Sequence, residues 1–142
     1  MPSIYKCSNG RILVMSDRKS IFQEIEKFGV VPCVALITAW VMGGEIGAWD
    51  LIVKRLLESG CKYFVCAGTY AENLHDLVDE IIISQGKEMI VTTYHEDESP
   101  EDVANFFVNA TDISNKKNGG LVAILDDAVL GDKLIKESLI RM

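Results

Sequence analysis

Two clusters of ionisable side chains contain the residue types with which proteins ligate metals and transfer protons. His75 and Asp79 stand four positions apart in a segment of helical period, and this spacing puts both side chains on one helix face. His95 and Asp97 follow a short apolar run with the composition of a β-strand. Imidazole and carboxylate groups serve as metal ligands and as general acids or bases. A small enzyme or a ligand or metal site would therefore use His75, Asp79, His95 and Asp97.

The same residues also have a plainer interpretation. The helix face that carries His75 lies roughly opposite the apolar stripe of Leu77 and Ile81, where solvated charges are expected. A histidine and an aspartate at this spacing also stabilise a helix as a pair. The sequence contains no GxSxG, HExxH or protein-kinase motif that would supply the rest of a mechanism. We predict no bound metal and no cofactor, and we favour a non-enzymatic function while leaving catalysis open.

The charge of the chain favours a basic protein as partner. The sequence has 21 acidic and 14 basic residues, which gives a net charge of −7 at pH 7. Nucleic acids and anionic membranes are bound by Lys and Arg, so this charge argues against both as direct partners. The acidic residues that would contact a basic toxin or nuclease domain are Asp76, Asp79, Glu80, Glu96, Asp97, Glu98 and Glu101.

Two aliphatic residues extend this predicted partner surface. Leu51 and Ile83 project roughly 160 to 180° away from the apolar stripes of their segments, on the side expected to face water. Exposed apolar side chains favour contact with a partner protein or with a second copy of the chain. A homodimer is therefore kept as an alternative assembly.

Glycine and cysteine residues in the chain are assigned structural roles. Gly43 and Gly44 match neither dinucleotide-binding nor phosphate-loop spacing, and Glu45 puts a negative charge where a phosphate would bind.

The four cysteines are irregularly spaced and predict no disulfide framework. Cys66 is a candidate nucleophile at a predicted strand end, but a buried structural thiol is the expected role. Cys61 and Cys66 are expected to point to opposite faces of one strand.

Five short apolar runs alternate with longer segments of helical period, which is the pattern of a mostly parallel sheet. Several runs are apolar at successive positions, so helices are expected on both faces of the sheet. The predicted class is therefore an α/β domain of three layers with a five-stranded sheet. The predicted strands are 11–15, 33–40, 63–67, 89–94 and 121–125.

Capping residues mark several of the predicted helices, which span about 17–28, 46–57, 70–85 and 128–141, with one more that begins near position 100. Gly60 and Gly86 stand where a left-handed residue would end a helix. Ser99 followed by Pro100 is typical of a helix start. Residues 69–72 have capping-box spacing, and 126–127 are expected to form a turn that caps the last helix.

Residues 1–142 are expected to form one domain in the cytoplasm. No apolar run approaches the ~20 residues that span a bilayer, and positions 1–6 lack the features of a signal peptide. Ligands of such sheets gather beyond the carboxyl ends of the strands. The segments expected at that edge are 40–44, 66–70, 94–98 and 126–127.

Three stretches of the chain resemble an uncharacterised family of small bacterial α/β domains. They are the sequence at 57–64 with Ala67-Gly68, then His75-Asp76-Leu77-Val78-Asp79, then Thr92-Thr93-Tyr94-His95-Glu96-Asp97-Glu98. In that family a tryptophan often stands where Tyr94 is here. The resemblance implies the fold and a bacterial origin, and it implies no activity.

In size and acidity the chain is also similar to immunity proteins, which neutralise toxins that bacteria deliver to competitors. The favoured expectation is therefore a non-enzymatic protein-binding domain, most concretely an immunity-type inhibitor that covers a bacterial toxin with its acidic surface. The alternative is the small enzyme or ligand or metal site described above.

Overall fold

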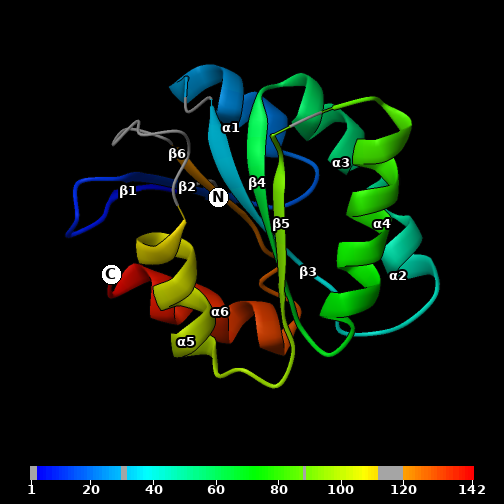
Figure 1. Ribbon diagram of the computed structural model, residues 1–142. Coiled ribbons are helices and arrows are strands. Elements are labelled where there is room, and N and C mark those ends of the chain that lie inside the picture. Colours follow the sequence, from blue (N-terminus) through cyan, green and yellow to red (C-terminus); the bar gives the residue numbers. More distant parts are fainter. Residues whose placement is uncertain (1–2, 30–31, 88, 112–119) are drawn as a thin grey trace.

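The computed structural model describes residues 3–29, 32–87, 89–111 and 120–142. Within these ranges one six-stranded sheet has the order β1-β2-β6-β3-β4-β5 (Figure 1). Strand β1 pairs antiparallel with β2, and all other neighbouring strands are parallel. The strands are β1 (Ser3–Lys6), β2 (Ile12–Ser16), β3 (Cys33–Thr38), β4 (Cys61–Ala67), β5 (Val91–His95) and β6 (Gly120–Ile124).

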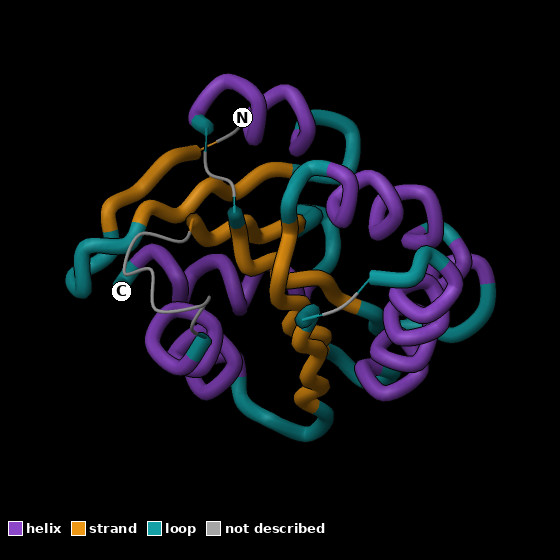
Figure 2. Tube along the Cα trace, turned by 45° about the horizontal axis from the view of Figure 1, so that its top comes forward, coloured by secondary structure: helices purple, strands orange, loops and turns teal. Residues whose placement is uncertain are grey.

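Helices cover both faces of this sheet, as Figures 1 and 2 show. One face packs against α1 (Ile21–Phe28), α3 (Trp49–Glu58) and α4 (Ala71–Ser84), and its core includes Trp49 and Phe64. The short helix α2 (Gly44–Gly47) leads into α3. The other face packs against α5 (Pro100–Asn105), the π-helical turn η1 (Phe106–Ala110) and α6 (Leu130–Ile140), around Phe107. The predicted α/β class with helices on both faces is confirmed.

The sheet has one strand more than the five predicted, and all five predicted runs form strands. The additional strand, β1, pairs with β2 through a hairpin in which Gly10 has φ +91°. The side chain of Asn9 accepts a hydrogen bond from the amide of Arg11 within this turn. The dipeptide Asn9-Gly10 is a strong hairpin signal. The predicted set of strands missed β1, which is only four residues long, although this dipeptide indicates a hairpin.

The observed start of a helix agrees with the predicted one where the predicted capping side chain accepts a backbone hydrogen bond. The two differ where it does not. Ser99 caps α5 as predicted, because its hydroxyl accepts the amide of Asp102. Helix α4 begins after Tyr70 without a side-chain cap, so the predicted capping box at 69–72 is wrong. Helix α6 begins after Val129, also without one, so the predicted aspartate cap is wrong as well. No helix among the described residues is long and apolar enough to cross a membrane.

Candidate functional site

The carboxyl ends of five parallel strands lie along one edge of the sheet. The chain leaves β2, β3 and β4 toward helices on one face, and it leaves β5 and β6 toward helices on the other. Neighbouring strands whose connections diverge in this way open a crevice between them. Two hollows lie at this edge: one near the ends of β3, β4 and β5, and one near the ends of β2, β6 and β3.

The first hollow, the His95 cavity, has a volume of about 330 Å³ and lies between the sheet edge and helices α5 and α6. Its polar lining comes from Thr69, His95, Asp97 and Glu98. Its apolar lining comes from Trp40, Pro100, Val103, Leu134 and Ile135. Gly68 and Gly131 complete the wall. The cavity thus combines apolar walls with two carboxylates, and no lysine or arginine among the described residues lines it.

His95 is the most deeply placed ionisable residue of this cavity. Its Nδ1 lies 2.8 Å from a carboxylate oxygen of Glu98, and its Nε2 lies 3.0 Å from the hydroxyl of Thr93. A carboxylate only accepts hydrogen bonds, so Nδ1 carries the proton that His95 donates to Glu98. The imidazole also packs against Phe106 of η1, with ring centroids 4.3 Å apart. These contacts fix the ring and the loop that follows β5.

The order hydroxyl, imidazole and carboxylate in Thr93, His95 and Glu98 is that of a nucleophilic triad. In a catalytic triad, however, the hydroxyl must face the substrate. Thr93 does not line the His95 cavity, whereas His95 and Glu98 do. Its hydroxyl also hydrogen-bonds the side chain of Tyr63. The arrangement therefore positions His95 and Glu98 at the cavity wall, and it does not present a nucleophile.

Asp132 holds the aromatic wall of the cavity in place. Its carboxylate accepts hydrogen bonds from the Thr38 hydroxyl at 2.7 Å, from Trp40 Nε1 at 2.7 Å and from the amide of Asp126 at 2.9 Å. The side chain is buried in the structure. Gly131, the preceding residue, lies so close to the Trp40 ring that a methyl group there would approach ring atoms to 2.3 Å. Asp132 therefore ties the ends of β3 and β6 to the start of α6.

Burial of Asp132 has a pH-dependent consequence. Burial raises the pKa of this carboxyl above 3.8, and the three hydrogen bonds oppose the rise only in part. A group with a raised pKa in the folded state contributes stability that is complete below its unfolded pKa and is lost as pH rises through its folded pKa. We expect the unfolding free energy of the wild type to fall relative to that of Asp132→Asn as pH rises from about 3.5 to 7. Urea titrations across this pH range measure both unfolding free energies. A difference between them that does not change with pH would contradict the prediction.

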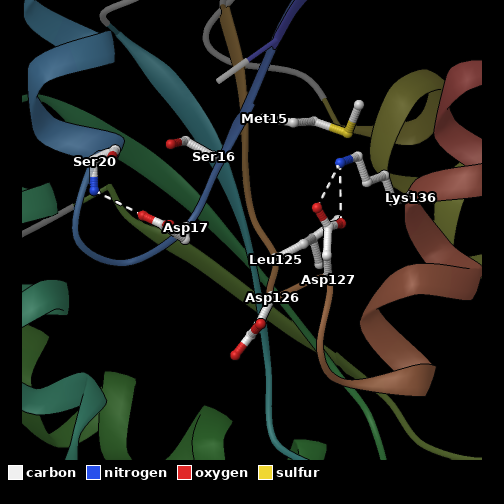
Figure 3. Close-up of a pocket in the computed structure, with 8 residues that line it drawn as sticks. All are labelled: Met15, Ser16, Asp17, Ser20, Leu125, Asp126, Asp127 and Lys136. Carbon is white, nitrogen blue, oxygen red and sulfur yellow. Dashed lines mark hydrogen bonds and ion pairs between the residues drawn. The ribbon is translucent and has the colours of Figure 1, made fainter. Parts of the chain in front are cut away.

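The second hollow, the Asp17 cleft, has a volume of about 620 Å³, and its charged lining residues are Asp17, Arg18, Lys19, Glu45, Asp126 and Asp132. A smaller hollow of about 150 Å³ adjoins it and shares Asp17 and Asp126 (Figure 3). Figure 3 shows Lys136 directed at Asp127, at 3.0 Å, while Asp126 points away from this pair.

Most of the carboxylates of the Asp17 cleft already accept hydrogen bonds from the protein. Asp17 accepts the amides of Lys19 and Ser20, and Asp126 accepts the amide of Ala128. Glu45 accepts the amides of Trp40 and Val41. These contacts are those of turns and helix starts. The predicted turn at 126–127 is therefore present. The Glu45 carboxylate accepts hydrogen bonds from the amides that would otherwise be free to bind an anion.

The structure does not bring His75 and Asp79 together with His95 and Asp97. Adjacent residues of a strand point to opposite faces. On the α4 side of β5, His75 packs against Tyr94 with ring centroids 5.1 Å apart, and Asp79 accepts the Thr92 hydroxyl. His95 lies on the α5 side, against Phe106. Among the described residues no group of three or more histidine, cysteine or acidic side chains forms a metal site.

His75 and Asp79 form the helix pair of the plainer interpretation, but the expectation that their face is solvated is wrong, because His75 is only 19% exposed and packs against β5. Nε2 of His75 lies 3.5 Å from a carboxylate oxygen of Asp79, one turn further along α4. The aliphatic residues Leu51 on α3 and Ile83 on α4 are 76% and 77% exposed, which confirms that both face water. The two helices that carry them pack against each other.

Cysteine side chains are all buried, and none is placed for catalysis. Burial raises the pKa of the Cys66 thiol well above its ordinary value, and the charge of Asp79 adds to the rise. Cys61 and Cys66 pack in the same core, so the expectation that they face opposite sides is wrong. The pairing of β3 with β4 shifts by one residue after Cys33, which leaves Lys62 as an extra residue in β4. This bulge turns Cys61 to the same face as Cys66.

The acidic residues are concentrated at one end of the sheet. Positions 63–111 contain ten acidic residues and one basic residue, Lys87, whereas the rest of the chain contains eleven acidic and thirteen basic residues. This segment supplies α4 on one face, α5 on the other and β5 as the edge strand between them. We call this part of the molecule the acidic end. All seven acidic residues predicted to contact a partner belong to it.

Comparison with models of protein families identifies the family of this chain. The family described as Domain of unknown function (DUF7684) matches residues 15–130. The chain belongs to this family. The acidic end of this DUF7684 domain lies wholly within the matched range, whereas the α6 side of the His95 cavity, with Gly131, Leu134 and Ile135, lies beyond it. A search of the curated proteins found no match. A search of the solved structures likewise found none.

Sequence reasoning missed two parts of this DUF7684 domain's site. It placed Trp40 at the correct edge but did not foresee its contact with Asp132, because 92 positions separate the two residues. It also treated the acidic clusters separately, although the near absence of basic residues over 63–111 was visible in the sequence. A count of charges along the chain would have revealed the acidic end.

Proposed function

We propose that this protein is a non-enzymatic domain that binds a basic protein partner through its acidic end. The observation that carries this proposal is the separation of charge: ten acidic residues and one basic residue at 63–111. Side chains of one sign on one part of a surface attract an oppositely charged partner and speed its association. The rest of the surface, where basic residues slightly outnumber acidic ones, would not attract the same partner.

Exposed apolar side chains within the acidic end would provide the contact area of this interface. Tyr94 and Val91 on the edge strand β5 are each 45% exposed, and Ile83 on α4 is exposed as well. Aromatic residues supply much of the energy of protein interfaces, and charged residues around them supply orientation. Asp76 and Glu80 are exposed on α4, and Glu101 is exposed on α5. A partner would thus contact both helices and the strand between them.

The most specific form of this proposal is an immunity-type inhibitor that acts in the cytoplasm. The active sites of many nucleases are basic because they bind phosphates. An acidic surface that covers such a site blocks the substrate and satisfies the basic side chains at once. The acidic end combines the charge and the apolar area that this role requires.

Co-expression with the product of the adjacent gene tests the proposal. We expect the adjacent gene product to arrest growth when expressed alone and this protein to restore growth. The variant Asp76→Lys, Glu80→Lys, Glu101→Lys should lose this protection, because it reverses three exposed charges of the acidic end. An adjacent product that is harmless, or that stays toxic with the wild-type protein present, would contradict the immunity role.

A matched control separates the acidic end from net charge. Glu26, Glu58 and Glu137 are exposed and lie outside 63–111. Their combined substitution by lysine changes the net charge by the same amount as the first variant. We expect this control to protect as well as the wild type does. Equal loss of protection in both variants would contradict a binding surface at the acidic end.

A further inference from the structure

We propose that the His95 cavity binds a small organic ammonium ion, with the ammonium group at Asp97 and Glu98 and an apolar body against Trp40 and α6. The cavity lies within the acidic end, and Asp97 and Glu98 are among the predicted partner contacts, but Asp76, Glu80 and Glu101, which the partner test reverses, do not line it. The inference rests on the size, lining and hydrogen bonding of the cavity.

The size of the cavity sets the size of the ligand. Its volume of about 330 Å³ lies near the lower limit of ligand pockets, which span roughly 300 to 1,000 Å³. It lies at the carboxyl edge of the sheet, where β4 and β5 send their connections to opposite faces. Ligands of α/β proteins bind at such positions. The cavity therefore suits a molecule of about one ring and a short chain.

The sign of the ligand's charge follows from the lining. Asp97 and Glu98 contribute two carboxylates, and within the part of the chain that the structure describes neither lysine nor arginine lines the cavity. Glu98 is held by His95 at 2.8 Å. Asp97 has no hydrogen bond or ion pair with any residue that the structure describes, so its charge is available to a ligand. Trp40 adds an aromatic wall, and aromatic rings attract organic cations.

Anions are disfavoured at the starts of α5 and α4, because backbone amides there are missing or already donate within the protein. A helix start attracts an anion through free N–H groups. At α5, Pro100 has no N–H, and the amide of Asp102 donates to Ser99. At α4, the amide of Glu72 donates to the carboxylate of Glu96 at 3.0 Å. These two helix starts therefore offer an anion few free donors.

The backbone at Asp97 also indicates a constrained position. Its φ of +56° lies in the left-handed region, which few residues other than glycine adopt. Such conformations are retained where the surrounding structure enforces them, and they often occur at binding sites. Here the hydrogen bond that His95 donates to the neighbouring Glu98 fixes the loop and leaves the Asp97 carboxylate at the cavity.

The test uses three probes with one body and different charges: 2-phenylethylamine, 2-phenylethanol and phenylacetate. Isothermal titration calorimetry of the full chain at pH 7 measures each affinity. We expect the amine to bind roughly tenfold more tightly than the alcohol, and phenylacetate to bind most weakly. Equal affinity for all three probes, tighter binding of phenylacetate, or no binding of the amine at millimolar concentration would overturn the proposal.

Two pairs of variants locate the binding in the cavity. Asp97→Asn should lower the affinity of the amine toward that of the alcohol, whereas Glu101→Gln, outside the cavity, should leave it unchanged. Leu134→Trp should fill the cavity and abolish binding of the amine, whereas Leu130→Trp, one turn earlier on α6 and 71% exposed, should not. Amine binding that survives both Asp97→Asn and Leu134→Trp would overturn the proposal. The co-expression test reverses Asp76, Glu80 and Glu101, which do not line the cavity, so the two proposals are tested at different residues and fail separately.

Discussion

Replacing Gly68 with alanine is expected to lower the free energy of unfolding by about 3 kcal/mol, through backbone strain and overpacking together. Gly68 has φ +103°, where an L-residue with a side chain is strained. A methyl group there would also lie 2.4 Å from the carbonyl oxygen of Ala39. That carbonyl accepts the amide of Tyr70, and the amide of Ala39 donates to Ala67, so the backbone cannot move aside easily.

A second glycine serves as the control for this prediction. Gly10 has φ +91° but has open space where a methyl group would be added. Gly10→Ala therefore adds the strain without the clash, and we expect it to cost about 1 kcal/mol. Urea unfolding followed by circular dichroism measures both variants. Equal losses for the two would contradict the close contact between Gly68 and Ala39.

Replacing Asp132 with alanine is expected to destabilise the protein by about 3 kcal/mol and to change the fluorescence of Trp40. The substitution leaves the Thr38 hydroxyl, the Trp40 indole N–H and the Asp126 amide without their acceptor. Each unpaired buried donor costs about 1 to 3 kcal/mol, less whatever water restores. Trp40 loses the contact that holds it at the cavity, so the amine probe should bind less tightly as well.

Asp127 provides the matched control for Asp132. It lies in the turn that precedes α6, the helix of Asp132, and it pairs with Lys136, but its side chain is 67% exposed. Exposed ion pairs contribute between 0 and about 1 kcal/mol, so Asp127→Ala should change stability little. If Asp132→Ala and Asp127→Ala had similar effects on stability and on Trp40 fluorescence, the role of Asp132 in fixing the cavity wall would be refuted.

The fold was predictable from local pattern because its strands and helices are each marked by their own residues. Runs such as Val34 to Ile37 are apolar at every position, and burial on both faces explains why. The exposed positions of Leu51 and Ile83 followed from helical period alone. The predicted capping box at 69–72 is not formed, because packing can override the preference of a capping motif. Helix α4 begins instead after a turn at Gly68, in which the amide of Tyr70 donates to the carbonyl of Ala39.

The site was less predictable because it depends on pairs distant in sequence. The four residues His75, Asp79, His95 and Asp97 share a chemistry, yet Tyr94 and His95 point to opposite faces of β5, and the helix that carries His75 packs on only one of them. Periodicity places residues on a face of their own element. It does not predict which face of the sheet that element covers. His75 and His95 are apart because they lie on opposite faces of the sheet.

The affinity of this protein for the adjacent gene product, measured by calorimetry, tests the acidic end most directly. The measurement compares the wild type, the reversal at Asp76, Glu80 and Glu101, and the control reversal at Glu26, Glu58 and Glu137. We expect the first reversal to weaken binding about a hundredfold and the control to remain within about threefold of the wild type. Equal weakening by the two reversals, or wild-type affinity in the first, would contradict the account.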